Sequence, residues 1–253
     1  MISETQIFDR TERLLGPDAM ERIASTRVIL FGVGGVGGWC AESLVRSGIR
    51  HLTLVDSDTV NATNLNRQVQ ATTETLGQLK VEALRNRLLT INPNADITAL
   101  PEVYSAETAD RFPLENYDFV IDAIDSLTPK AHLILQASQQ PVTLLSSMGS
   151  ALKLDPTKIK VAEFWKVQYC PLARALRKKF KHWHKFPERK FLCVYSPEVL
   201  DNQCESLAED TTPDEFHKVQ INGTVAHITA IFGFTLAGLA IQLRIENEVR
   251  ICT

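Results

Sequence analysis

Four glycines near the start of the chain have the spacing of a phosphate-binding loop. Residues 32–37 read Gly-Val-Gly-Gly-Val-Gly directly after a run of apolar residues. In this pattern the first glycine permits a tight turn, the second lets the backbone approach a phosphate, and the third lets a helix pack closely on a strand. The amino end of that helix favours the negative charge of the phosphate. Gly32, Gly34, Gly35 and Gly37 are therefore predicted to bind a nucleotide, and Asp56, at the end of the next apolar run, to bind its ribose.

The glycine loop and Asp56 alone fit NAD at least as well as ATP. The polar run over residues 57–68 favours ATP, because a dehydrogenase needs no such run at this place. Attack on the α-phosphate of ATP needs cations for the triphosphate and an acid to hold magnesium. We predict Arg67 and Lys80 as the cations and Asp125 as the magnesium ligand. Taken singly, Arg67 and Lys80 also suit solvated surface positions, and Asp125 also suits a helix N-cap.

The elements that must position these residues follow an alternating pattern. Strands are predicted over residues 27–31, 51–55, 96–100, 118–124 and 142–147, and helices over 36–47, 76–91 and 129–138. This alternation predicts a Rossmann-like α/β fold, a mostly parallel sheet with helices on both faces and its ligand site at the carboxyl ends of the strands.

The pattern changes after Gly149, where a strand over residues 158–164 and a basic helix from Pro171 are predicted. We expect an ATP-binding domain over residues 1–150. Residues 151–253 are expected to form a C-terminal lobe that completes the sheet and the substrate side, within one compact unit.

Composition limits the class of protein. The chain has 253 residues, of which 44% are hydrophobic, and a net charge of -3, so a nucleic-acid partner would need a local basic patch. Its five cysteines include no C-x-x-C pair, and its first ten residues include no apolar export segment, which together favour the cytoplasm. Residues 224–243 approach the length of a membrane span but include a histidine and two glycines, so we expect a buried core helix and favour membrane contact less.

A basic segment over residues 171–190 provides such a patch. Its cations alternate with aromatic and histidine side chains, and cations can contact phosphates while aromatic rings stack on exposed bases. The predicted RNA contacts are Arg174, Arg177, Lys178, Lys181 and Lys185. The alternative is a solvated helix face that Trp183 anchors to the core.

Over residues 8–150 the chain resembles the ThiF-type superfamily of adenylating enzymes, which activate ubiquitin-like proteins and bacterial sulfur carriers. The matching stretches, in the order and approximate spacing of that superfamily, are residues 32–37, 56, 63–68, 77–80, 91–93 and 122–125. The resemblance implies ATP and Mg²⁺ as cofactors, with the magnesium at Asp125 and no zinc site. The implied ATP site contains Gly32, Gly34, Gly35, Gly37, Asp56, Asp58, Asn64, Arg67, Gln68, Lys80 and Asp125.

The resemblance also implies a homodimer. Arg13 matches an arginine that reaches the ATP of the neighbouring subunit in this superfamily, so Arg13, Arg67, Lys80 and Asp125 are the implied catalytic residues. From the residues alone, Arg13 would pass as an ordinary helix charge.

The second half resembles a narrower family, bacterial enzymes that cyclise threonylcarbamoyladenosine in transfer RNA with loss of water. The matching stretches are residues 154–159, 171–173, 193–196 and 231–234, together with 122–126 and 129–131 in the first half. The resemblance implies an acyl-adenylate intermediate, and its ring closure within one molecule needs no protein nucleophile. Cys193 is accordingly expected to be a core residue.

Three other functions stay open at this stage. An adenylyltransferase for the C-terminus of a ubiquitin-like sulfur carrier would use the same ATP site, with a sulfur-transfer or carrier protein as partner, but the zinc-binding C-x-x-C pairs common in those enzymes are absent. An NAD-dependent oxidoreductase would leave Arg13, Arg67 and Lys80 without a role. A non-catalytic module that keeps its nucleotide site is the third.

Overall fold

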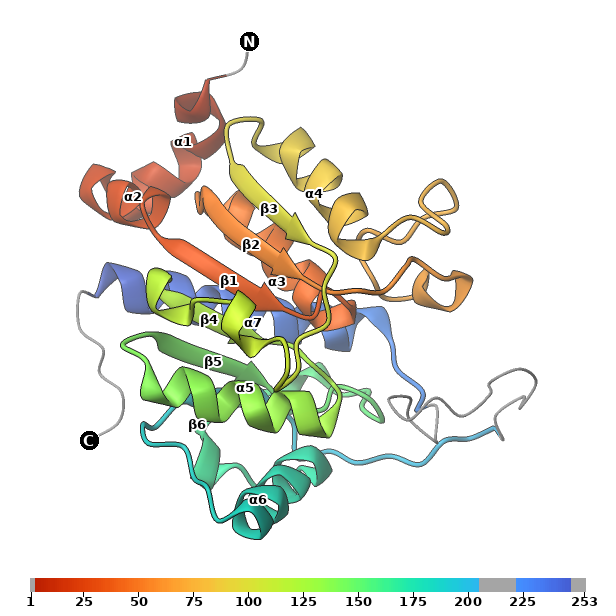
Figure 1. Ribbon diagram of the computed structural model, residues 1–253. Coiled ribbons are helices and arrows are strands. Elements are labelled where there is room, and N and C mark those ends of the chain that lie inside the picture. Colours follow the sequence, from red (N-terminus) through yellow and green to blue (C-terminus); the bar gives the residue numbers. More distant parts are fainter. Residues whose placement is uncertain (1–2, 205–221, 247–253) are drawn as a thin grey trace.

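The computed structural model describes residues 3–204 and 222–246 (Figure 1). Of the expected C-terminal lobe, residues 205–221 and 247–253 lie outside the described residues. The division near residue 150 remains a prediction.

Within the described residues, seven strands form one sheet in the order β3-β2-β1-β4-β5-β7-β6. Six of them are parallel and the edge strand β6 is antiparallel to β7, which confirms the predicted fold class. The chain thus completes the sheet beyond β5 with its later part, as expected. The strands are β1 (Arg27–Phe31), β2 (His51–Val55), β3 (Asp96–Leu100), β4 (Phe119–Asp122), β5 (Thr143–Ser147), β6 (Lys160–Glu163) and β7 (Leu192–Tyr195).

Helices cover both faces of this sheet, and Figure 1 shows α5 in front of it and α7 behind. The alternation of side chains along β1 explains why two cores form. Val28 and Leu30 pack with α3, α4 and α7, whereas Ile29 and Phe31 pack with α5 and α6. The helices are α1 (Glu4–Leu15), α2 (Pro17–Ala24), α3 (Gly35–Arg46), α4 (Lys80–Ile91), α5 (Leu127–Gln139), α6 (Pro171–Trp183) and α7 (Ala226–Ile245).

The predicted helix over residues 76–91 is wrong at its start, since α4 begins at Lys80. The backbone of the preceding residues bonds to the polar run instead, with the Gly77 N–H donating to the Val60 carbonyl at 2.9 Å and the Val60 N–H to the Gln78 carbonyl at 2.8 Å. Gly77 has a φ of +79°, which a helix does not accept. Lys80 therefore stands in the first turn of α4, at the edge of the sheet where a ligand would bind.

Helix α7 packs along α3 and buries one face, which includes Ile228, Phe232 and Leu236, so the expected core helix is confirmed for that face only. Among the described residues it is also the one helix long and apolar enough to cross a membrane, judged by length and composition. Gly233 makes the packing possible: a Cβ there would lie 2.4 Å from the Val36 carbonyl oxygen and 2.7 Å from the Cys40 nitrogen.

We expect Gly233→Ala to destabilise the protein by about 1–3 kcal/mol, the usual cost of overpacking a core contact. Gly238→Ala is the matched control, because a Cβ at Gly238 in the same helix would meet no atom within 4 Å. That control should be neutral or stabilise by up to about 1 kcal/mol, since alanine is the better helix former. Urea unfolding measures both variants, and equal stabilities would contradict the contact.

Candidate active site

The glycine loop joins β1 to α3 across the carboxyl end of β4. Gly32 has a φ of +84°, and a Cβ there would lie 2.8 Å from the Ala123 carbonyl oxygen. At Gly37 a Cβ would lie only 1.8 Å from the Gly32 carbonyl oxygen. The predicted turn and packing roles of these two glycines are thus confirmed. At Gly34 the nearest atom to such a Cβ is Gln68 Nε2 at 3.8 Å, so the backbone there is open to a ligand.

Asp56 lies beside this loop, directly after β2. Its Oδ2 accepts a hydrogen bond from the Val33 N–H at 2.8 Å, and its Oδ1 accepts one from the Asp58 N–H at 2.9 Å. Burial raises the pKa of Asp56. The carboxylate is held against the glycine loop, where a ribose of a loop-bound nucleotide would lie.

Lys80 forms an ion pair across the site with Asp58, Nζ to Oδ2 at 2.7 Å. The lysine side chain is 8% exposed and that of Asp58 is 64% exposed. The Lys80 side chain is therefore buried rather than solvated, and its ammonium group ends at the exposed carboxylate of Asp58. The Lys80 N–H also donates to the Asp58 carbonyl at 2.9 Å, which fixes the start of α4 against the strand end.

Arg67 lies over the glycine loop and electrostatically close to Asp125. Its guanidinium donates to the Thr63 carbonyl at 2.7 Å and to Asn66 Oδ1 at 2.9 Å. Burial lowers the pKa of Arg67, and the carboxylate of Asp125 opposes that shift. The exposed Asp125 follows β4, where Ser126 Oγ donates to its Oδ1 at 3.4 Å. Arg67 and Asp125 are therefore near enough at this edge of the sheet for their charges to interact.

Asn64 and Gln68, in the same polar run as Arg67, are buried. The Oδ1 of Asn64 accepts from the Asn61 N–H at 3.0 Å, and its predicted contact with a phosphate remains a prediction. Gln68 Oε1 accepts from Gln70 Nε2 at 3.4 Å, and Gln70 Nε2 donates to the Val33 carbonyl at 2.6 Å. These amides connect the polar run to the glycine loop.

A buried ion pair under Asp125 received no role from the sequence. Lys130 Nζ lies 2.7 Å from Asp122 Oδ2, and both side chains are 0% exposed. Lys130 Nζ also donates to the Ile124 carbonyl at 3.0 Å, while Asp122 Oδ1 accepts from the Ile124 N–H at 3.1 Å. Ser146 Oγ adds a bond to Asp122 Oδ2 at 2.7 Å. The pair thus holds both backbone polar groups of Ile124, the residue next to Asp125. The sequence did contain a hint of this pair, because Lys130 stands on a predicted helix face that is otherwise apolar.

Arg13 lies apart from these residues within the chain. It is exposed on α1 and pairs with Asp9 at 2.9 Å. Helix α1 contacts the opposite edge of the sheet, where Glu4 binds Arg50 and Asn92, which precede β2 and β3. A catalytic role for Arg13 therefore requires a second chain and remains a prediction.

The five cations predicted to contact RNA divide into two groups. Arg174, Lys178, Lys181 and Lys185 are exposed. Arg177 instead donates to the Phe164 and Val167 carbonyls at 2.5 and 2.7 Å, and so holds the segment before α6 in place.

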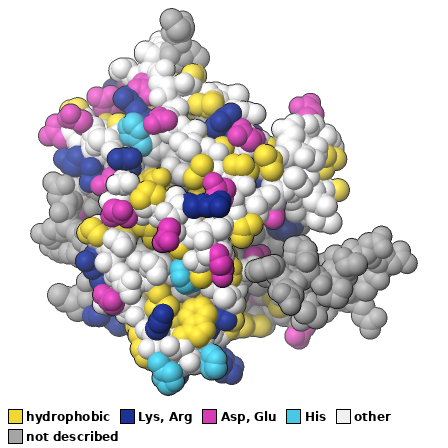
Figure 2. All heavy atoms as spheres, viewed as in Figure 1, with side chains coloured by type: hydrophobic (Ala, Val, Ile, Leu, Met, Phe, Trp, Pro, Cys, Tyr) yellow, Lys and Arg dark blue, Asp and Glu magenta, His cyan; other side chains and the backbone are white. Residues whose placement is uncertain are grey.

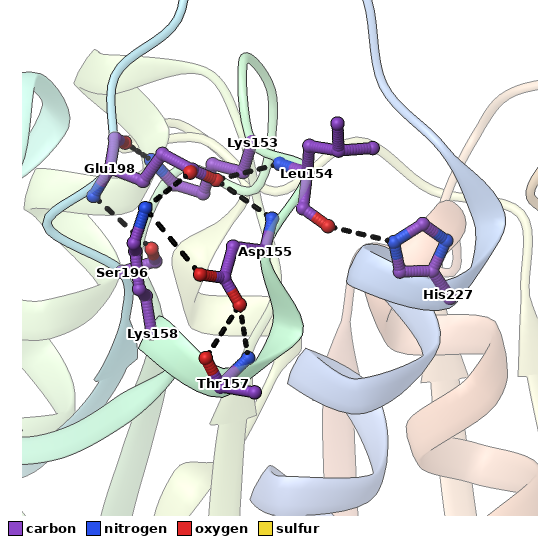
Figure 3. Close-up of polar contacts among 8 residues, drawn as sticks. All are labelled: Lys153, Leu154, Asp155, Thr157, Lys158, Ser196, Glu198 and His227. Atoms are coloured by element: carbon purple, nitrogen blue, oxygen red, sulfur yellow. Dashed lines mark hydrogen bonds and ion pairs between the residues drawn. The ribbon is translucent and has the colours of Figure 1, made fainter.

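A second polar cluster fixes the start of α7 at the same edge of the sheet (Figure 3). Glu198, after β7, accepts hydrogen bonds from the Leu154 and Asp155 N–H groups at 2.7 and 2.9 Å and pairs with Lys158 at 2.9 Å. The Leu154 N–H, followed by Lys158 and the Asp155 N–H, lowers the pKa of Glu198 to about 2. His227 of α7 contacts the Leu154 carbonyl at 3.0 Å. The cluster holds together three segments: residues 154–158, the residues that follow β7, and the first turn of α7.

Comparison with known proteins identifies the family of this chain. A profile of the ThiF family matches residues 8–251, nearly the whole chain. The chain belongs to the ThiF family. Its resemblance to ThiF-type adenylating enzymes, noted from the sequence, is confirmed.

Relatives of this ThiF-family protein include tRNA threonylcarbamoyladenosine dehydratases. That of Bacillus subtilis (strain 168) is 40% identical over 174 residues, which are 69% of this chain and 68% of that protein. That of Escherichia coli (strain K12) is 32% identical over 256 residues, 97% and 96% of the two chains. The crystal structure of the E. coli dehydratase in complex with ATP has a TM-score of 0.84 over 98% of both chains. An E. coli molybdopterin-synthase adenylyltransferase is 34% identical over 139 residues, 54% of each chain.

We expect Lys130→Met to destabilise this ThiF-family protein by about 3–5 kcal/mol, because it leaves the Asp122 carboxylate buried without its partner. Burial raises the pKa of Asp122. The deficit should therefore be larger at pH 8 than at pH 5, because a lower pH protonates Asp122 in the folded state and removes the uncompensated charge.

The double variant Asp122→Asn, Lys130→Met is the control, since it removes both charges and should recover more than half of the lost stability. Urea unfolding at the two pH values measures these effects. A double variant as unstable as the single one would show that the ion pair is not the cause.

Proposed function

We propose that this protein is an ATP-dependent tRNA threonylcarbamoyladenosine dehydratase, which removes one water from the modified nucleoside through an acyl adenylate. The observation that carries the proposal is the convergence of Arg67, Lys80 and Asp125 beside the glycine loop and Asp56. Relatives that match nearly the whole chain bear the name of this dehydratase, and one of them has been crystallised with ATP.

The reaction divides into two steps. A carboxylate oxygen of the threonyl group attacks the α-phosphorus of ATP, and pyrophosphate leaves with the electrons of the broken P–O bond. The neighbouring carbamoyl group then attacks the activated carbonyl carbon, loses an N–H proton to solvent, closes a ring and expels AMP. One oxygen of the carboxylate thereby leaves with the AMP, which accounts for the net loss of water.

The protein's contribution to the first step is mainly electrostatic. Lys80 and Arg67 supply positive charge near the oxygens of the pentacoordinate transition state, and partial burial makes that interaction stronger than in water. Lys80 is already directed by Asp58, so little reorganisation is needed when a nucleotide binds. Asp56 and the amino end of α3 hold the ribose and phosphates.

Asp125 fits the role of magnesium ligand. Mg²⁺ is usually bound through one or two carboxylates together with substrate phosphates. Asp125 is an exposed carboxylate beside the glycine loop, and among the described residues no cluster of three His, Cys, Asp or Glu could hold a metal by itself. When bound with ATP, the ion would neutralise phosphate charge. Asp125 would hold it at a position that Lys130 and Asp122 fix through Ile124.

The second step needs proximity and no protein nucleophile, because the reacting groups belong to one molecule. Cys193 agrees with this reading: it is fully buried, and burial raises its pKa well above the ordinary value of a thiol. A thiol of that kind is inert. The expected core role of Cys193 is thus confirmed.

The adenylyltransferase of a ubiquitin-like sulfur carrier is the second candidate, because the matching E. coli enzyme covers 54% of this chain. It would bring a carrier protein as partner. We favour the dehydratase because its relatives also match the second half of the chain. A cytoplasmic location and a homodimer belong to the same proposal.

The proposed function is tested by AMP and pyrophosphate release from ATP with unmodified or threonylcarbamoyl-modified tRNA, followed by mass analysis of the nucleosides. We expect release only with the modified tRNA and a nucleoside lighter by one water. Asp125→Ala should lower the rate roughly 100-fold or more, the scale of losing one group that stabilises transition-state charge, with unfolding unchanged. Release that depends on a carrier protein instead would favour the second candidate, and near-normal turnover by Asp125→Ala would contradict the metal role.

A homodimer with Arg13 acting on the partner's site predicts complementation. Arg13→Ala and Asp125→Ala subunits should each be inactive alone. Mixed in equal amounts, they should regain about a quarter of wild-type activity, because half of randomly formed dimers then contain one complete site. No recovery after verified subunit exchange would show that each site is built within one chain.

A further inference from the structure

A groove outside the ATP site lies between α6 and the segment that precedes it. Its volume is about 590 Å³. The residues that line it are Trp165, Val167, Gln168, Tyr169, Cys170, Arg174, Arg177, Lys178 and Lys181. Figure 2 shows hydrophobic side chains beside Lys and Arg side chains at the lower end of the face drawn, where Figure 1 places α6.

One wall of the groove is a row of cations. Arg174, Lys178 and Lys181 are spaced four and three residues apart and therefore share one face of α6. All three are exposed, and no acidic residue lines the groove. Because the whole chain has a net charge of -3, this row is a local feature rather than a consequence of a basic composition. It favours an anionic ligand.

The other wall presents two exposed aromatic rings. Trp165 is 43% exposed and Tyr169 is 72% exposed, between buried neighbours such as Val167 and Cys170. Exposed rings of this size provide flat apolar faces beside the cations, a combination that suits a nucleotide better than an acidic peptide.

Tyr169 also has a strained backbone. Its φ is +58°, which is rare for a bulky residue and costs of order 1–3 kcal/mol. The bonds of Arg177 to Phe164 and Val167 hold the segment in which this strain persists. The strain leaves the ring in solvent rather than in the core, so packing alone does not explain it. Strained residues of this kind cluster at ligand-binding sites.

The groove begins at the same edge of the sheet as the ATP site. Leu172, in the first turn of α6, lies 3.7 Å from the position of a Cβ on Gly149, which follows β5. The neighbouring strand β4 leads to Asp125. The start of α6 thus lies beside the carboxyl ends of the central strands, so an RNA whose modified nucleoside lies next to bound ATP would have the groove on the same edge of the sheet.

We propose that this groove binds an unpaired nucleotide of the RNA substrate, with a phosphate on Arg174, Lys178 and Lys181 and a base stacked on Tyr169 or Trp165. The inference rests on the proposed function, which makes the substrate a tRNA. The bases of paired RNA are hidden from side chains, so stacking requires a loop or another single-stranded stretch.

The test measures the affinity of the full-length protein for unmodified tRNA at several salt concentrations, and the KM for modified tRNA in the AMP-release assay. Tyr169→Gly should weaken tRNA affinity at least about five-fold, because stacking on one aromatic ring is lost. It should leave the KM for ATP unchanged and leave the unfolding temperature equal or higher, because glycine accepts a positive φ. Tyr169→Phe, which keeps the ring, should stay within about two-fold of wild type.

A charge reversal tests the other wall. Lys178→Glu should weaken tRNA binding and reduce its salt dependence, because a phosphate contact is lost. Lys160→Glu makes the same charge change at an exposed residue of β6 outside the groove and should have no comparable effect.

The possible outcomes distinguish a failure of the proposed RNA groove from a failure of the proposed dehydratase function. Tyr169→Gly and Lys178→Glu variants with wild-type affinity for tRNA would overturn the groove, even if the wild-type protein dehydrates modified tRNA. Weakened binding by both variants, in a protein that releases no AMP with modified tRNA, would leave the groove standing and overturn the proposed function. Equal losses for Lys178→Glu and Lys160→Glu would also overturn the groove, because they would show a diffuse charge effect.

Discussion

The buried ion pair between Asp122 and Lys130 is the interaction on which the site depends. It lies where β4 ends, at the point where the strand order reverses between β1 and β4, the usual ligand position of an open α/β sheet. Two unpaired charges would be very unfavourable there, so each holds the other in place, and together they bind the backbone N–H and carbonyl of Ile124. The glycine loop then packs against the Ala123 carbonyl of the same turn. One buried contact thus sets the distance between the phosphate-binding loop and the acid at residue 125.

Around this point the fold separates two tasks. The first strands and α4 hold the groups for phosphate chemistry, with Lys80 held at the rim by its pairing to Asp58. The later elements extend the sheet beyond β5 and surround the same edge with a polar cluster at Glu198 and with the cationic, aromatic groove beside α6. We propose that nucleotide activation and recognition of the RNA substrate are served by different parts of one sheet, and the named relatives match both parts.

The sequence predicted the fold well where local pattern decides it. Strands β1, β2 and β3 have the predicted bounds, because short apolar runs between polar ends leave little choice. The turn role of Gly32 follows from its motif. Features set by long-range contacts were missed: the start of α4 depends on bonds to Val60, and Lys130 becomes an ion-pair partner only when the sheet buries it. Arg177 stands in a basic run, but its neighbours turn it toward two carbonyl groups. The reach of Arg13 to a second subunit stays a prediction.

The central claim is that this site activates a carboxylate by adenylation, and the fate of one oxygen atom tests it most directly. A modified tRNA whose threonyl carboxylate carries oxygen-18 would be converted with ATP, and the nucleotide product analysed by mass. Attack on the α-phosphorus forms a P–O bond that survives ring closure, so the account predicts one oxygen-18 atom in AMP. Unlabelled AMP, or ADP together with labelled inorganic phosphate, would contradict it, because the carboxylate would then have been activated elsewhere or through the γ-phosphate.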